Sequence, residues 1–279
     1  MMKKISIFED DVVDQEVQER LFKPTGSQLK YDAMVRKCVM GDSTLELALL
    51  LGLSSVVSSM RSYLLPSQVF HFSGLKMTGG ETALRLALST FGAPTEKGLI
   101  YSMEKGEQEL MDDWKEKPWL PIGVSDVEGA HDFFYQQDGT NPDVVPYLYG
   151  KTCLSIGNER ELPFQVKKDR VIELKNVEWG RDSRAIYRID EVIRENYAHM
   201  GPRLLQFIRS RFSPQEIDLR CDQKSALVRD FIGDSIYSNL TQWSAIIATA
   251  EIVEEGFDLD FSILNLLQLI QKIQRKGEE

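Results

Sequence analysis

Residues 69–94 constrain the fold more than any other part of this sequence. They begin with a short apolar run, "VFHF", pass through a turn that contains Gly74 and Gly79, and continue as a leucine-rich amphipathic stretch. Thr78 and Glu81 have the spacing of a capping box, which predicts the start of a helix. A buried strand that leads through a glycine-rich turn into a helix is the opening unit of a parallel α/β sheet.

Other short apolar runs predict further strands of the same sheet, and the remaining pattern is helical. Ser43 and Glu46 repeat the capping-box spacing before an apolar helix. Strands are predicted at 69–72, 119–125, 151–156 and 170–174, and helices at 44–60 and at about 186–211, 214–238, 239–255 and 260–276. We therefore divide the chain into an acidic N-terminal arm at 1–40, an α/β core at 41–185 and an α-helical lid or C-terminal domain at 186–279.

The composition is that of an ordinary globular chain of 279 residues, with 42% apolar residues and a net charge of −10. The acidic balance argues against a free-standing nucleic-acid coat. Cys38, Cys153 and Cys221 have no paired spacing, which favours a reducing compartment and no metal site. The apolar stretch at 45–60 contains Glu46 and four serines, so we expect a buried helix and not a membrane span. We expect a cytoplasmic protein that makes no membrane contact.

Gly74 and Gly79 have the spacing of a phosphate-binding loop, G-x-x-x-x-G-K-S/T, whose backbone N–H groups surround phosphates. Gly80 stands where the lysine belongs, and Glu81 stands where the hydroxyl that holds Mg²⁺ belongs. The missing lysine removes charge-assisted bonds of about 1.5–3 kcal/mol each. A carboxylate ~5 Å from a phosphate adds roughly 3 kcal/mol of repulsion. Together these changes weaken nucleotide binding by about a thousandfold or more.

Two nearby residues offer partial replacements. Lys76 lies inside the loop and reaches a phosphate only if its side chain turns inward. Thr82 replaces the Mg²⁺ ligand only if the motif slips by one residue, which breaks the glycine spacing. The residues of this degenerate nucleotide-binding loop are Gly74, Lys76, Gly79, Gly80, Glu81 and Thr82.

An ordered set of motifs resembles the AAA+ core of the MCM-like helicase proteins that bacterial phages and other mobile elements carry. The set consists of "FHFSGLKMTGGETALRLALSTFGAP", "LPIGVSDVEG", "LSIGNERELPF", "RVIEL" and "ENYAHMGP". Their order and spacing agree with that family over roughly residues 40 to 250. The resemblance implies a P-loop NTPase-like core of short strands and helices, followed by a C-terminal α-helical region.

The same resemblance implies where the catalytic acids of the Walker B motif belong. With Leu120 and Pro121 aligned, Ser125 falls at the metal-binding aspartate and Asp126 at the catalytic glutamate. A shifted alternative uses Asp126 and Glu128, whose side chains share a face of an extended segment. A solvated acidic turn is the ordinary interpretation of these carboxylates, so Walker B is eroded as well.

Two further positions correspond to functional residues of the family. Asn158 matches the position that orients the attacking water, although a polar turn after a strand explains it equally. Arg170 matches an arginine before the last strand and is a candidate finger across a subunit boundary, or else a surface ion-pair residue. We name Asp126, Glu128, Asn158 and Arg170 as the catalytic candidates.

The densest group of basic residues is a candidate nucleic-acid contact. In a chain of net charge −10 the alternative is a solvated face, or a contact for the acidic N-terminal segment. The group consists of Lys167, Lys168, Arg170, Lys175, Arg181 and Arg184.

The structural residues of the loop persist while the residues that carry its chemistry are replaced, which favours a catalytically degenerate, non-enzymatic binding or scaffold protein. We expect no cofactor, and protein partners or self-association. The alternatives are a divergent NTPase or helicase subunit that binds ATP and Mg²⁺, alone or in a mixed ring, and a DNA-binding accessory module.

Overall fold

The computed structural model describes residues 23–62, 68–73, 79–95, 98–101, 119–125, 152–157, 171–175, 177–233 and 239–277. The strands are β1 (Gln68–Ser73), β2 (Ile100–Tyr101), β3 (Ile122–Ser125), β4 (Thr152–Gly157) and β5 (Val171–Lys175). The helices are α2 (Gln28–Met34), the π-helical η1 (Val35–Val39), α3 (Ser43–Met60), α4 (Gly80–Ser89), α7 (Ser183–Ile193), α8 (Gly201–Arg211), α9 (Pro214–Ile232), α10 (Leu240–Phe257) and α11 (Ile263–Gly277).

The described sheet has the strand order β2-β3-β4-β1-β5, and every pair in it is parallel. The register aligns Phe70 with Leu154 of β4 and with Ile172 of β5, which places apolar side chains on one face. The four predicted strands are confirmed. The edge strand β2 escaped prediction because only two of its residues pair, too few to form a hydrophobic pattern.

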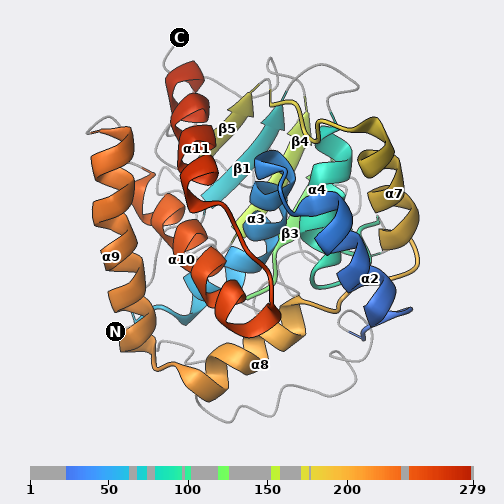
Figure 1. Ribbon diagram of the computed structural model, residues 1–279, viewed down its shortest axis with the longest axis horizontal. Helices are drawn as coiled ribbons and strands as arrows, with labels where there is room; N and C mark the ends of the chain where they lie inside the picture. The colour runs from blue at the N-terminus through green and yellow to red at the C-terminus, as the bar shows by residue number, and fades with distance from the viewer. Residues whose placement is uncertain are drawn as a thin grey trace, which may run out of the picture.

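The fold is mixed α/β, mostly helical, around this small parallel sheet. Figure 1 shows α3 and α4 in front of the sheet, α9 and α11 towards one side, and α2 and α7 towards the other. The helix α8 crosses the end of the molecule opposite to the arrowheads of β1 and β5. The helix α3 is the centre of the core: its leucines from Leu45 to Leu53 are buried, and it packs against both α4 and α10.

The start of α3 differs in detail from the predicted capping box of Ser43 and Glu46. Asp42 is the N-cap, and its carboxylate accepts hydrogen bonds from the backbone N–H groups of Thr44 and Leu45. The carboxylate of Glu46 accepts a hydrogen bond from the backbone N–H of Gly41, the residue before the N-cap. The helix is long and apolar enough to cross a membrane, but 78% of its apolar window is buried inside the protein. It is therefore the buried core helix that the sequence predicts.

The helix predicted at 186–211 is wrong as a continuous element, because the chain breaks it between α7 and α8. Ala198 has a positive φ of 62°, which a helix does not accept. The backbone of Tyr197 instead pairs with Thr25, and the His199 ring bonds the Thr25 carbonyl at 2.8 Å. A contact with a segment some 170 positions away in sequence therefore interrupts the helix.

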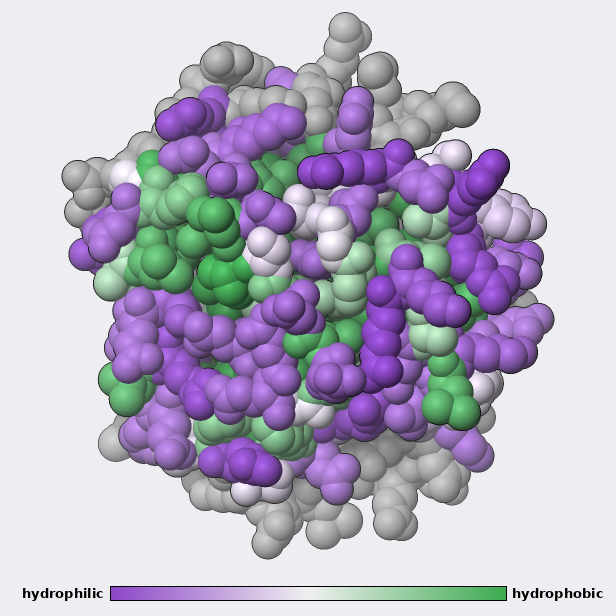
Figure 2. Space-filling view, viewed as in Figure 1, coloured by the Kyte–Doolittle hydropathy of each residue, from purple (hydrophilic) through white to green (hydrophobic). Residues whose placement is uncertain are grey.

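The predicted domain boundaries stay a prediction, but two packing facts bear on them. Tyr31 and Val35 of the short helices α2 and η1 are buried in the core, although they lie in the range assigned to the N-terminal arm. The apolar face of α11, which includes Leu266 and Ile270, is buried against the rest of the chain. Polar residues cover most of the face in Figure 2, and apolar residues gather over α9 and α11. Leu264 of α11 is 57% exposed.

Candidate functional site

The strand β1 and the helix α4 are the strand and the helix that the sequence predicts on either side of the loop. The strand ends at Ser73, and the helix begins at Gly80 with Gly79 as its N-cap. The N-cap is therefore Gly79, and Thr78, which the sequence predicts as the cap, lies outside the described residues. Gly79 has φ 78° and ψ 8°, and a Cβ there would lie 2.4 Å from the carbonyl oxygen of Trp179. Both the backbone conformation and the close approach of another segment require glycine.

Gly80 occupies a different environment from its neighbour. A Cβ at this position would lie 3.7 Å from Cδ1 of Trp179 and 3.8 Å from Cδ1 of Ile156, which are ordinary van der Waals contacts. The position therefore has room for the first atom of a side chain. Packing around Cβ therefore does not explain why glycine, and not lysine, stands at position 80.

The carboxylate of Glu81 points to solvent and forms an ion pair with Arg85 one turn later, with 2.7 Å between the charged atoms. Its side chain is 67% exposed. An ion pair this exposed contributes little stability. Its consequence is instead local: a negative charge occupies the first turn of α4, where a phosphate-binding helix presents its positive end.

Thr82 is buried, and its hydroxyl donates a hydrogen bond to Oδ2 of Asp190 on α7 at 2.7 Å. The bond fastens α4 to α7 at the first turn of α4. Among the residues that the structure describes, Oδ1 of Asp190 has no hydrogen-bond partner, although it is buried. The hydroxyl that the slipped motif would assign to Mg²⁺ therefore already has a partner inside the protein.

Residues 177–180 form a wall beside the start of α4. The Trp179 ring is buried and packs on Phe72 of β1, with 4.8 Å between the ring centroids. The N–H of Gly180 donates to Oγ1 of Thr44 at 3.0 Å. This second attachment joins the wall to the start of α3 as well as to β1.

Asp42 completes the attachment of the wall, because its Oδ2 accepts the N–H of Arg181 at 2.9 Å. Burial by itself raises the pKa of Asp42, but hydrogen bonds from Thr44, Leu45 and Arg181 outweigh it and lower the pKa below its usual value. Asp42 is therefore ionised at neutral pH and holds the wall as a charged acceptor.

The order of the strands places the predicted site at the carboxyl ends of the central strands. The chain leaves β1 in the direction of β2, and it leaves the neighbouring strand β4 in the opposite direction, towards β5. Ligands of open α/β sheets bind outside the carboxyl ends of the strands. At this end of the sheet Ser73 donates to Glu173 of β5 at 2.8 Å.

Several predicted site residues follow these strand ends but lie outside the described residues. They are Gly74 and Lys76 after β1, Asp126 and Glu128 after β3, and Asn158 after β4. Arg170, Lys167 and Lys168 precede β5 and also lie outside the described residues. Their roles stay predictions.

Three members of the basic group are described. Lys175 ends β5, and Arg181 and Arg184 are exposed around the start of α7. Lys175 is at the carboxyl end of β5 and the two arginines follow it, at the end of the sheet from which the loop to α4 leaves β1. The described residues include no group of three or more His, Cys, Asp or Glu placed to hold a metal ion.

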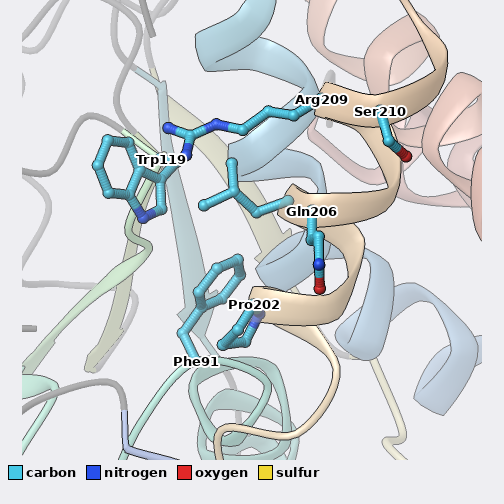
Figure 3. Close-up of a pocket in the computed structure, with 7 residues that line it drawn as sticks. Phe91, Trp119, Pro202, Gln206, Arg209 and Ser210 are labelled. Atoms are coloured by element: carbon cyan, nitrogen blue, oxygen red, sulfur yellow. The ribbon is translucent and has the colours of Figure 1, made fainter. Parts of the chain in front are cut away.

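A second concave site lies near the opposite end of the sheet, and sequence reasoning missed it. Trp119 precedes β3, Phe91 follows α4, and the remaining wall is one face of α8. The cavity has a volume of about 550 Å³. It is lined by Phe91, Trp119, Pro202, Leu205, Gln206, Arg209 and Ser210, as Figure 3 shows. No local motif marks it, because three segments far apart in sequence build it.

Comparison with known proteins shows a similarity to a domain of unknown function over part of the chain and to a helicase in fold. A family model described as a domain of unknown function, DUF927, matches residues 2–115, which is less than half of the chain. No curated protein matches the chain. A solved structure described as "SCCmec type IV Cch - active helicase" superposes with a TM-score of 0.77 at 19% identity.

That superposition covers 92% of this chain and 52% of the helicase chain, so the protein spans about half the length of its structural relative. At this identity the likeness shows the fold, which is helicase-like. The DUF927 match contains β1 and α4, the two elements between which the sequence predicts the phosphate-binding loop.

Proposed function

We propose that this protein is a catalytically degenerate AAA+ protein of the MCM-like helicase type that acts by binding other proteins. The observation that carries the proposal is the first turn of α4, where Gly80 and Glu81 replace the lysine and the hydroxyl of a phosphate-binding loop. The helicase-like fold and the parallel strand order support the P-loop comparison.

The contacts around this turn support loss of nucleotide binding. The carboxylate of Glu81 adds negative charge where the phosphates would lie, and the Thr82 hydroxyl is bonded to Asp190. A charge-assisted bond contributes about 1.5–3 kcal/mol. Loss of the lysine together with repulsion from Glu81 therefore removes most of the affinity that such a loop supplies.

The setting and partners follow from the same comparison as proposals. The structural relative is described as a helicase of SCCmec, so we propose a role in the replication or host interactions of a mobile element or phage. We propose a cytoplasmic location and a partner that is another protein or a second copy of this chain. ATP and Mg²⁺ belong only to the alternative in which Lys76, Asp126 and Glu128 take shifted roles.

Calorimetric titration with ATP and Mg²⁺ tests the proposal on three proteins: the wild type, the double variant Gly80→Lys with Glu81→Thr, and the control Gly80→Met with Glu81→Thr. The control has a side chain of similar length without the charge. We expect no heat from the wild type or the control, and binding to the lysine variant, because Gly80 has room for a Cβ.

Micromolar binding by the wild type, or ATP hydrolysis that Gly80→Ala abolishes, would contradict the proposal and restore the enzyme alternative. Equal binding by the lysine and methionine variants would show that the charge at this position is irrelevant. That outcome would remove the argument from Gly80.

A further inference from the structure

The cavity between Trp119 and α8 has the features of a binding site that are independent of nucleotide chemistry. Its volume of about 550 Å³ lies within the range of ligand pockets, and its floor is apolar. Figure 3 shows Trp119 on one side, Phe91 and Pro202 together at one end, and Arg209 extending from α8 across the cavity towards Trp119.

The apolar walls of this cavity are held in place by buried contacts. The hydroxyl of Ser55 on α3 donates to the carbonyl of Trp119 at 2.7 Å, which fixes that residue against the core helix. A Cβ at Gly201 would lie 2.5 Å from the Phe91 ring, so α8 begins in direct contact with this ring. The side chains of Trp119 and Phe91 are therefore already in place before a ligand binds, which lowers the entropic cost of binding.

Arg209 supplies a positive charge at the mouth of this cavity. Its guanidinium lies 5.6 Å from the centre of the Trp119 ring. Among the residues that the structure describes, no carboxylate forms an ion pair with Arg209. Partial burial lowers the pKa of Arg209 from its usual value, which is the expected cost of a guanidinium without a counter-charge.

A structural role for Arg209 must be separated from a binding role. Arg209 and Arg211 both lie in the last turn of α8, where a cation stabilises the end of a helix. Arg211 lies over Phe207, also at 5.6 Å, and does not line the cavity. The two arginines therefore lie on the same helix, carry the same charge and each contact an aromatic ring. They differ in that only Arg209 lines the cavity.

We propose that this cavity binds a segment of a partner protein that inserts one bulky apolar side chain next to a carboxylate. The apolar side chain packs between Trp119, Phe91 and Leu205, and the carboxylate pairs with Arg209. Gln206 and Ser210 lie on the exposed rim, where an amide and a hydroxyl suit the polar backbone of a peptide. The site is distinct from the degenerate loop, because it adjoins the start of β3 and the end of α4.

The test is a titration of the full chain, with its four tryptophans labelled with ¹⁵N, followed through the indole N–H signals. The signal missing in Trp119→Phe identifies Trp119. The probes are the tetrapeptide acetyl-Gly-Trp-Glu-Gly-amide, its Gln counterpart, and free N-acetyltryptophan. We expect the Glu peptide to shift the Trp119 signal saturably, with affinity at least tenfold higher than that of the Gln peptide.

Two matched variants assign the effect to the cavity. Arg209→Met is expected to remove the preference for the Glu peptide, and Arg211→Met, which changes the net charge equally, is expected to retain it. Unchanged thermal unfolding midpoints establish that both variants are folded.

Each remaining outcome would overturn the proposal. Equal affinity for the two peptides would leave an apolar cavity without recognition of a carboxylate. Binding of N-acetyltryptophan without binding of the peptides would assign the cavity to a small acid. The proposed site would be wrong if both arginine variants lost the preference for the Glu peptide equally, or if the Trp119 signal did not shift at millimolar peptide. None of these results depends on whether the protein binds ATP.

Discussion

Neighbouring residues at the start of α4 are under different packing constraints. Gly79 is required by its backbone conformation and by the carbonyl of Trp179. Gly80 has room for a Cβ, and among the described residues Glu81 pairs with Arg85 of its own helix and is 67% exposed. Packing therefore constrains Gly79, whereas it leaves room at Gly80 and leaves the Glu81 side chain in solvent.

Gly79→Ala and Gly80→Ala form a matched pair that tests this difference. Gly79→Ala is expected to lower the free energy of unfolding by at least about 1–2 kcal/mol, because alanine is strained at this φ. Gly80→Ala is expected to be neutral or to stabilise by up to about 1 kcal/mol, as alanine does at an unstrained helical position. Denaturation in urea measures both, and equal effects at the two positions would contradict the assignment of Gly79 as the strained N-cap.

At the scale of elements, buried polar contacts join helices that the hydrophobic pattern alone does not orient. Arg61, directly after α3, has a side chain only 1% exposed and pairs with Asp218 of α9 at 3.2 Å and with Asp222 at 3.3 Å. Asp218 also accepts the N–H of Ser62 at 3.1 Å. These bonds hold α9 across the end of α3.

Arg61→Met is expected to lower the free energy of unfolding by about 3–5 kcal/mol, because it leaves the carboxylate of Asp218 without its buried cation. The matched control is Arg188→Met, which breaks an exposed pair with Glu191 and is expected to cost less than about 1 kcal/mol. Chemical denaturation measures the difference, and similar costs for both variants would show that the Arg61 bonds do not hold the helices together.

At the scale of the whole molecule, the described elements share one hydrophobic core. Its buried side chains extend from Tyr31 of α2 to Ile273 of α11, and α3 contacts elements on both sides of the sequence-predicted boundary at 185–186. A core shared in this way couples the stability of the C-terminal helices to that of the sheet.

We therefore expect the protein to unfold in a single cooperative transition. Far-ultraviolet and near-ultraviolet circular dichroism should give coincident melting curves, and the calorimetric and van't Hoff enthalpies should agree. Two separated transitions would instead support an independent helical domain at 186–279.

The amino-acid sequence by itself predicted four of the five described strands, and it shows Gly80 and Glu81 at the positions where a phosphate-binding loop has its lysine and its hydroxyl. These features are local: a short apolar run predicts a buried strand, and a missing lysine is visible without coordinates. The sequence did not predict the break after α7, because the pairing of Tyr197 with the distant Thr25 causes it. It also did not predict the N-cap of α4, where Gly79 lies against the carbonyl of Trp179. Only the tertiary structure decided that Trp119, Phe91 and α8 enclose one cavity, because a cavity depends on which distant side chains meet and no local pattern records that.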